Sequence, residues 1–309
     1  ALNGKNLACK GKTGSGKTHC FLIPIANKID ESSKNLQALI LVPTRELALQ
    51  INQRCKEFFK DFDIKISCLT GGVDTLREKN RIQTTPQILI GTPEKICDIA
   101  INSGLVNLKY VNTFVVDEAD MTLEMGFLNE VDRIAYLCKD AQMMVFSATL
   151  PAGIKQFIKK YFKSPLIIED EKSNNNDNIT HILYPLRSKD VNNELLTIIN
   201  NINPYVCLIF ANTKENVEQI YKFLINNGVE CGIIHGDLQA RERKGNIKKA
   251  LSGMYKFIVC SDIAARGIDI PGVSHVISIH LPKNNLEFYT HRAGRAGRMN
   301  LDGICITLY

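Results

Sequence analysis

A glycine-rich segment near the start of the chain has the residue types and spacing of a phosphate-binding loop. Residues 11–18 read G-K-T-G-S-G-K-T and fit the pattern G-x-x-x-x-G-K-[ST]. Small residues let backbone N–H groups converge on a polyphosphate, and a helix beginning at about Gly16 adds its positive end. We expect Lys17 to reach the β- and γ-phosphates and the Thr18 hydroxyl to bind Mg²⁺. The loop therefore predicts binding of a nucleoside triphosphate by Thr13, Gly14, Ser15, Gly16, Lys17 and Thr18.

An adjacent pair of acidic residues supplies the second half of this predicted ATPase site. Asp117 and Glu118 directly follow the apolar run 114–116. An acidic residue at the end of a buried strand can position Mg²⁺ and its water, and we assign this role to Asp117. Glu118 is then placed to orient and deprotonate the attacking water.

The elements that must position these residues are short apolar runs that end abruptly in polar residues or glycine. Runs that are apolar throughout are typical of strands covered on both faces, and helix-length segments separate them. This pattern predicts parallel α/β sheets with ligands at the carboxyl ends of the strands. The runs are 39–42, 88–90, 114–116, 143–146, 206–210, 232–234, 257–260, 276–279 and 304–308.

The pattern divides the chain into two expected domains. Residues 169–178 contain no apolar anchor and are typical of a surface linker. We therefore expect domains at 1–168 and 179–309, of which only the first carries a phosphate loop. The length of 309 residues and the hydrophobic content of 45% are sufficient for two cores.

Composition limits the kinds of molecule that the chain can bind and the cellular compartments in which it can occur. The net charge of +6 permits nucleic-acid binding, although the basic stretch 155–163 is more typical of a solvated helix face. The ten cysteines include no C-x-x-C pair, which argues against a disulfide framework or a zinc site. We find no signal peptide and no apolar run long enough to cross a bilayer. We expect a cytoplasmic protein without a membrane partner, and leave targeting by a preceding segment open.

The motifs in this order resemble those of the DEAD-box RNA helicases of superfamily 2. The resemblance rests on D-E-A-D at 117–120 and extends essentially from end to end, looking most similar to bacterial cold-shock-type members. It implies two tandem RecA-like domains that use ATP and Mg²⁺, bind RNA and locally unwind short duplexes. The other matching motifs are P-T-R-E-L-A at 43–48, G-G at 71–72, S-A-T at 147–149, S-D-I-A-A-R-G-I-D at 261–269 and H-R-A-G-R-A-G-R at 291–298.

The resemblance also implies roles for individual residues. Arg295 and Arg298 would be arginine fingers, and their spacing of three places them on one face if the segment is helical. Gly267 and Asp269 would contact the ribose. The residues implied to couple nucleotide to the domain interface are Ser147, Thr149 and His291. Those implied to contact the RNA backbone without sequence preference are Thr44, Arg45, Gly72, Thr92, Lys95, Arg243 and Ser261.

Three departures from the family pattern are visible. Residues 92–95 read T-P-E-K where T-P-G-R is usual, which replaces a guanidinium with an ammonium and adds a carboxylate. Ala240 stands where the family has glutamine. The printed sequence opens at Ala1, so we expect the adenine-reading Q motif to be missing, and it stops at Tyr309 without the usual helix.

Two other classes of function remain open at this stage. Missing ends would be compatible with a non-catalytic RNA-binding clamp or scaffold, and the ATPase motifs are shared with superfamily 2 DNA translocases. The complete ATPase motifs favour an enzyme, and D-E-A-D together with P-T-R-E-L-A favours RNA over DNA. We expect a monomer and leave protein cofactors unspecified.

Overall fold

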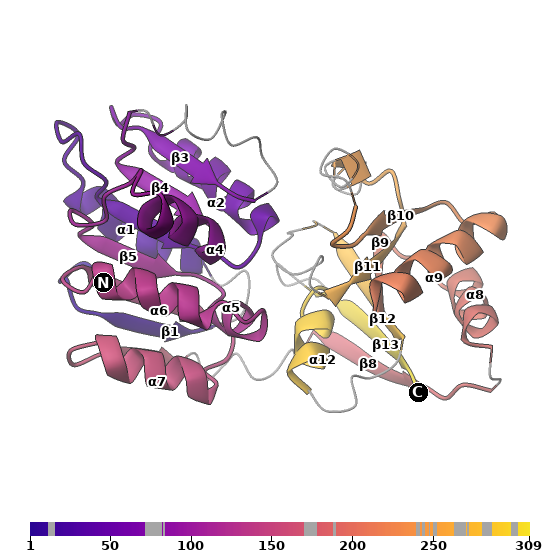
Figure 1. Cartoon of the computed structure of the whole chain (residues 1–309). Helices are drawn as coiled ribbons and strands as arrows, with labels where there is room; N and C mark the ends of the chain where they lie inside the picture. The colour runs from indigo at the N-terminus through magenta and orange to yellow at the C-terminus, as the bar shows by residue number, and fades with distance from the viewer. Residues whose placement is uncertain are drawn as a thin grey trace. The chain divides into compact units, whose positions relative to one another are not determined.

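The computed structural model divides the chain into two compact units, Ala1–Ser173 and Asn174–Tyr309. Figure 1 shows the elements of both units. The structure describes residues 1–11, 16–71, 82, 84–169, 178–187, 190–238, 242, 245–246, 248–249, 252–262, 270, 272–279, 286–297 and 302–309.

The first unit is built on seven parallel strands in the order β3-β4-β2-β5-β6-β1-β7. Because parallel neighbours end on the same side, the residues after β1, β2, β4, β5 and β6 meet along one edge of the sheet. The strands are β1 (Leu7–Lys10), β2 (Ala38–Leu41), β3 (Ile66–Leu69), β4 (Ile88–Gly91), β5 (Thr113–Val116), β6 (Gln142–Ser147) and β7 (Leu166–Glu169).

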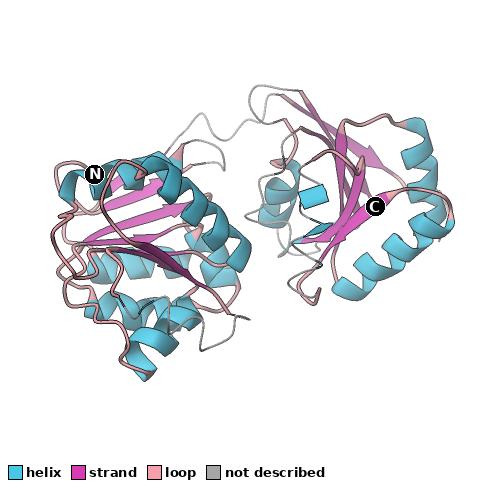
Figure 2. Cartoon of the chain, turned by 90° about the horizontal axis from the view of Figure 1, so that it is seen from above, coloured by secondary structure: helices cyan, strands magenta, loops and turns pink. Residues whose placement is uncertain are grey.

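Helices cover both faces of this sheet (Figures 1 and 2). Side chains of α1 and α2 pack in one core, and those of α6 and α7 pack in the other. The helices are α1 (Lys17–Lys28), α2 (Arg45–Phe58), α4 (Pro93–Ile96), the π-helix η1 (Cys97–Asn102), α5 (Ala119–Glu124), α6 (Leu128–Leu137) and α7 (Ala152–Tyr161).

The central strand β5 shows why the apolar runs in the sequence are continuous. Phe114 and Val116 face the core shared with α6 and α7, whereas Val115 faces the core shared with α1 and α2. Successive strand residues point to opposite faces, so a strand covered on both sides must be apolar at every position. All of β5 is buried, and the acidic residues Asp117 and Glu118 follow directly after its last residue.

The second unit repeats this architecture with six parallel strands in the order β10-β11-β9-β12-β13-β8. Its core is again split by the sheet: Leu208 and Phe210 of β9 lie on one side and Ile209 on the other, with α8 and α9. The elements are β8 (Ile179–Tyr184), α8 (Val191–Asn201), β9 (Val206–Ala211), α9 (Lys214–Asn226), β10 (Cys231–Ile234), β11 (Phe257–Ser261), β12 (Val273–Ile279), α12 (Leu286–Ala293) and β13 (Gly303–Leu308).

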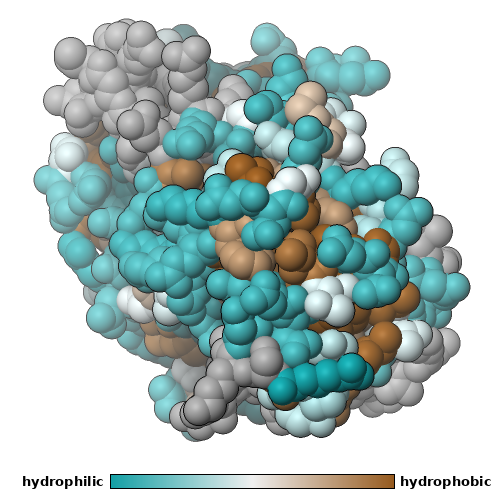
Figure 3. All heavy atoms as spheres, turned by 90° about the vertical axis from the view of Figure 1, so that its right-hand side faces the viewer, coloured by the Kyte–Doolittle hydropathy of each residue, from teal (hydrophilic) through white to brown (hydrophobic). Residues whose placement is uncertain are grey.

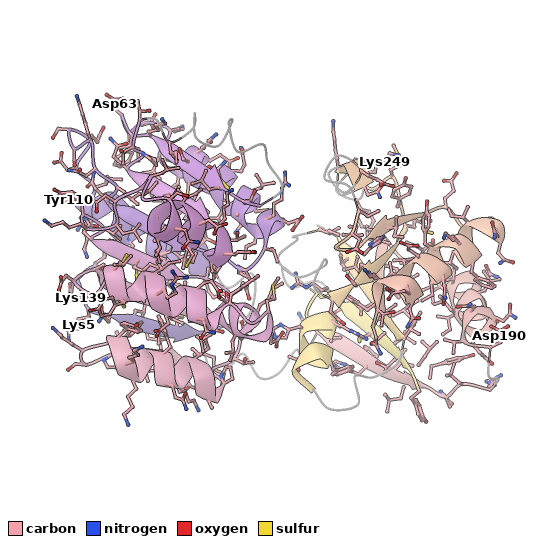
Figure 4. All side chains as sticks on the ribbon, viewed as in Figure 1. Lys5, Asp63, Tyr110, Lys139, Asp190 and Lys249 are labelled. Carbon is pink, nitrogen blue, oxygen red and sulfur yellow. The ribbon has the colours of Figure 1, made fainter. Side chains whose placement is uncertain are left out.

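The outer face of α8 and α9 is largely hydrophilic, with apolar atoms exposed between the polar side chains (Figure 3). The start of α8 is capped by Asp190 (labelled in Figure 4), whose carboxylate accepts from the N–H groups of Asn192 and Asn193. Such a cap satisfies backbone donors that the first helical turn leaves open.

The α/β fold with two parallel sheets, expected from the sequence, is confirmed. Glu169, expected to begin the linker, is the last residue of β7. Residues 170–177 lie outside the described part, so the domain limits 1–168 and 179–309 stay a prediction. No helix of the described residues is long and apolar enough to span a bilayer.

Candidate active site

The phosphate loop lies between β1 and α1. Gly16 caps the first turn of α1 with φ of 86°, a left-handed conformation that favours glycine because it has no Cβ. The helix then begins at Lys17, as the sequence predicts to within one residue. The loop residues 12–15 lie outside the described part, and with them the predicted phosphate contacts of Thr13, Gly14 and Ser15.

Lys17 connects the phosphate loop to the acidic pair after β5. Its ammonium group is buried, donates to the carbonyl oxygen of Gly11 at 3.0 Å and lies 3.6 Å from Oε1 of Glu118. Burial lowers the pKa of Lys17, but the charges of Glu118 and Asp117 outweigh burial and raise the pKa above its ordinary value. The lysine therefore stays charged, as a phosphate-binding lysine must.

A sharp turn after β5 carries the two carboxylates of the acidic pair. Glu118 has φ of 49°, a left-handed conformation that is unfavourable for a residue with a side chain. Asp117 is buried at the end of the strand, and its Oδ1 accepts from the Glu118 N–H at 3.0 Å. Burial, followed by the charge of Glu118, raises the pKa of Asp117 to about 7. The turn thus holds two carboxylates close enough for the charge of one to raise the pKa of the other.

A second set of hydrogen bonds ties the same turn to the end of β6. The Asp120 N–H donates to the Ser147 hydroxyl at 2.9 Å. Oδ2 of Asp120 accepts from both the N–H and the hydroxyl of Thr149, at 2.9 and 3.1 Å. Asp120 and Ser147 are almost fully buried, so these bonds are shielded from water. A movement of Thr149 would therefore shift Asp120, and with it the acidic turn, through these hydrogen bonds.

Thr18, the predicted Mg²⁺ ligand, has a partner that the sequence did not reveal. Its hydroxyl oxygen accepts from Nη1 of Arg54, on α2, at 3.2 Å. Thr18 is buried in the first turn of α1, and Arg54 lies 36 residues away in the chain. No local spacing connects the two residues, and only the packing of α1 beside α2 brings them together.

The predicted RNA contacts of the first unit lie after β2, β3 and β4, which are neighbours in the sheet. The Thr44 hydroxyl caps α2 by accepting from the Leu47 N–H at 3.3 Å. Nη1 of Arg45 donates to the Gly71 carbonyl oxygen at 3.2 Å. Thr92 caps α4 through its backbone position, and Lys95 is half-buried in that short helix. Gly72 lies outside the described residues.

The second unit contains a fully buried arginine at the start of the predicted H-R-A-G-R-A-G-R motif. Nε and Nη2 of Arg292 each donate to one carboxylate oxygen of Asp262 at 2.6 Å. The same guanidinium donates to Ser278 at 2.5 Å and to Asn212 at 2.8 Å. Arg292 thereby fixes the end of β11, where Ser261 lies, to β12 and to the end of β9.

The remaining predicted residues of the second unit are only partly described. The helix α12 ends at Ala293, so Arg295 lies in the following turn, where its N–H donates to the Arg292 carbonyl at 3.1 Å. The condition that this segment is helical, on which a shared face of Arg295 and Arg298 depended, is therefore not met at Arg295. His291 is half-buried in the last turn of α12. The predicted residues outside the described part are Arg298, Gly267, Asp269 and Arg243.

Comparison with protein families agrees with this arrangement. The model of the DEAD/DEAH box helicase family matches residues 1–157, and that of the helicase conserved C-terminal domain matches residues 190–300. The chain belongs to the DEAD/DEAH box helicase family. The family expected from the sequence is confirmed, as is the resemblance to bacterial cold-shock-type members.

Individual relatives match along the whole chain. The DEAD-box ATP-dependent RNA helicase CshB of Staphylococcus aureus is 38% identical over 312 residues, which are 100% of this chain and 69% of the relative. CshB of Bacillus subtilis is 39% identical over 313 residues, 100% of this chain and 71% of the relative. Among solved structures, S. cerevisiae Dbp5 bound to RNA and ADP BeF3 is similar with a TM-score of 0.88 and 29% identity, covering 99% of this chain and 79% of that one.

Sequence reasoning missed Arg54, Arg292 and Asp262 as members of these sites. The arginine spacing in residues 291–298 gave no sign of which arginine is buried, since all three arginines fit a basic surface equally well. A signal was available for Asp262, because it stands two residues after the apolar run 257–260 and directly after β11, much as Asp117 follows β5.

Proposed function

We propose that the residues of the first unit hydrolyse ATP for an RNA-stimulated ATPase and RNA helicase that binds RNA without sequence preference. The observation that carries the proposal is the 3.6 Å ion pair between Lys17, which follows the phosphate loop, and Glu118 of the D-E-A-D turn. It places a phosphate-binding cation beside a carboxylate that can act as general base. Family membership and relatives that are ATP-dependent RNA helicases support this function.

In the proposed reaction, Lys17 binds the β- and γ-phosphates and leaves Glu118 as they enter. Glu118 then orients a water and accepts its proton as the water oxygen attacks the γ-phosphorus. The bond from the γ-phosphorus to the oxygen that bridges it to the β-phosphate breaks, and its electron pair leaves with ADP, so the products are ADP and inorganic phosphate. The left-handed turn at Glu118 directly follows the buried Asp117, and it leaves the Glu118 carboxylate 3.6 Å from Lys17. Backbone strain of this kind persists where the surrounding structure fixes it, here through Asp120 and Ser147.

The residues present fit a Mg²⁺ ion. Mg²⁺ prefers oxygen ligands, and a carboxylate (Asp117) and a hydroxyl (Thr18) follow β5 and the phosphate loop on the same edge of the sheet. The raised pKa of Asp117 fits too, because a buried carboxylate is costly without a cation. We propose that Thr18 and Asp117 hold Mg²⁺, which when bound neutralises charge on the phosphate oxygens.

We further propose that the chain contacts the RNA backbone through residues of both units. In the first unit, Thr44, Arg45 and Thr92 offer hydroxyl and guanidinium groups suited to phosphates and 2′-hydroxyls. The structure of Dbp5 bound to RNA and ADP BeF3 is a similar protein in complex with RNA. The other proposed RNA contacts are Gly72, Lys95, Arg243 and Ser261.

The remaining proposed roles belong to nucleotide sensing and transition-state charge. Arg295 and Arg298 would stabilise charge on the transferred phosphoryl group, and Gly267 and Asp269 would contact the ribose. Ser147 and Thr149 would report nucleotide through their hydrogen bonds to Asp120, together with His291. We propose further that the chain acts as a monomer in the cytoplasm.

The proposed function is tested by ATP hydrolysis measured with no nucleic acid, with single-stranded RNA and with DNA of the same sequence. We expect stimulation by RNA that DNA does not match, because the contacts include 2′-hydroxyls. Lys17→Ala provides the background rate. Equal stimulation by DNA would instead favour a DNA translocase, and RNA binding without hydrolysis would favour a scaffold.

A further inference from the structure

Two side chains of α2 contact the first turn of α1, directly after the phosphate loop. Arg54 donates to the Thr18 hydroxyl at 3.2 Å, and the ring of Phe58 meets the ring of His19 edge-on, with centroids 6.2 Å apart. Arg54 and Phe58 are four residues apart, so they lie on the same face of α2. The contacts are adjacent on both helices, which makes the position of Arg54 beside Thr18 part of the α1–α2 packing.

We propose that Arg54 competes with Mg²⁺ for the Thr18 hydroxyl and so raises the Mg²⁺ concentration that nucleotide binding requires. The inference rests on the proposed function, in which Thr18 is a Mg²⁺ ligand. Arg54 is a positioning residue in this scheme, since it acts through Thr18 and not on the nucleotide.

The competition follows from the chemistry of the hydroxyl group. An arginine guanidinium keeps its positive charge at all physiological pH values and can only donate hydrogen bonds. When it donates to Oγ1 of Thr18, it engages an oxygen lone pair and places a positive charge beside that oxygen. A divalent cation approaching the same oxygen meets like charge, in a part of α1 where Thr18 is buried and screening by water is weak.

The structure also indicates that Arg54 can leave. Arg54 is exposed although it reaches Thr18, whereas Thr18 is buried in the first turn of α1. Water can therefore solvate the guanidinium once it leaves Thr18, so its departure does not leave a charge buried. We call the hydrogen bond from Nη1 of Arg54 to Oγ1 of Thr18 the latch.

The test is a Mg²⁺ titration of fluorescent mant-ADP binding to the full chain, with EDTA at the starting point. In Arg54→Met, the Mg²⁺ concentration that gives half of the Mg²⁺-dependent signal should fall by about tenfold, the size expected for losing a hydrogen bond to a charged group. Affinity in EDTA should change by less than about twofold, because no cation then competes for Thr18. Gln53→Met is the matched control: Gln53 is the exposed neighbour on α2 and bonds Glu57 within the same helix.

A double variant separates the latch from a general effect of α2 on folding. Thr18→Val removes the hydroxyl with little change in shape, so Arg54→Met added to it should not shift the Mg²⁺ half-point further. An unchanged or higher Mg²⁺ requirement in Arg54→Met alone, or an equal shift in the Thr18→Val background, overturns the proposal. If wild-type chain fails to bind mant-ADP even in Mg²⁺, the nucleotide site itself is wrong, which is a different outcome.

Discussion

The buried ion pair of the second unit leads to a quantitative prediction about stability. Arg292 is 1% exposed and makes both of its 2.6 Å bonds to Asp262 away from water. Arg292→Met keeps the length and apolar bulk of the side chain but leaves the Asp262 carboxylate without its cation. Breaking a buried pair in this way costs about 3–5 kcal/mol of unfolding free energy. We therefore expect Arg292→Met alone to lower the free energy of unfolding by a large amount.

The double variant Arg292→Met/Asp262→Leu should be more stable than Arg292→Met alone. Removing both charges removes the cost of an unpaired buried carboxylate, and replacement of a buried pair by apolar residues is often close to neutral. Ser278 and Asn212 still lose a hydrogen-bond partner, at about 1 kcal/mol each. The double variant should therefore recover about 1–3 kcal/mol of the loss.

These differences can be measured by urea unfolding followed by far-UV circular dichroism. If the unfolding free energy falls by about 2 kcal/mol per M of urea, the urea concentration at the unfolding midpoint should be about 2 M lower for Arg292→Met than for wild type. Hydrogen exchange in peptides from β9, β11 and β12 assigns the transition to the second unit. Arg187→Met, at an exposed arginine of the same unit, is the control and should lie within about 0.5 kcal/mol of wild type. A loss below about 1 kcal/mol, or a double variant no more stable than Arg292→Met, refutes the reasoning.

Three further predictions concern the nucleotide site and the response to pH. Lys17→Ala should abolish both nucleotide binding and turnover, because a cation leaves the phosphate cradle; equilibrium titration with mant-ADP that shows unchanged affinity contradicts this role. Glu118→Gln should bind ATP and RNA but stop hydrolysis, trapping an RNA complex; wild-type turnover in a single-turnover assay shows that another group is the base. Burial lowers the pKa of His275 below its ordinary value of 6.5. The unfolded chain then binds a proton at His275 more readily than the folded chain does. The free energy of unfolding therefore decreases as pH falls below 6.5 and through the lower pKa of the folded state. His275→Gln should weaken this pH dependence of the urea midpoint, and an identical dependence rules out His275 as its source.

Much of the fold could be predicted because buried parallel strands leave a strong pattern in the sequence. Phe114, Val115 and Val116 of β5 face two cores alternately, so all three are apolar, and the acids that follow mark the end of the strand. The same reasoning located Ser147 at the end of β6 and Ser261 at the end of β11. Motif order then identified the family, and P-T-R-E-L-A, D-E-A-D and S-A-T stand at strand ends that the pattern had already indicated.

Side-chain partners that are distant in sequence could not be predicted. The Arg54–Thr18 and Arg292–Asp262 contacts join residues 36 and 30 positions apart, and long flexible side chains leave no periodic signal of where they point. Backbone conformation at turns could not be predicted either, as at Glu118, where a left-handed conformation occurs at a residue other than glycine.

The end of α12 could have been predicted more closely. Arg295 lies beyond the helix because α12 ends at Ala293, just before Gly294. Glycine near a helix end commonly marks its termination, so this boundary had a local signal.

The most direct test of the central claim is strand displacement from a short RNA duplex, followed by gel separation of a labelled strand. With ATP and Mg²⁺, the chain should release the labelled strand in a single round, whereas Glu118→Gln should bind the duplex and release none during the same period. A DNA duplex of the same sequence should remain paired. Equal strand release by wild type and Glu118→Gln, or release from DNA at the rate seen with RNA, would contradict an ATP-driven RNA helicase built on the Lys17–Glu118 site.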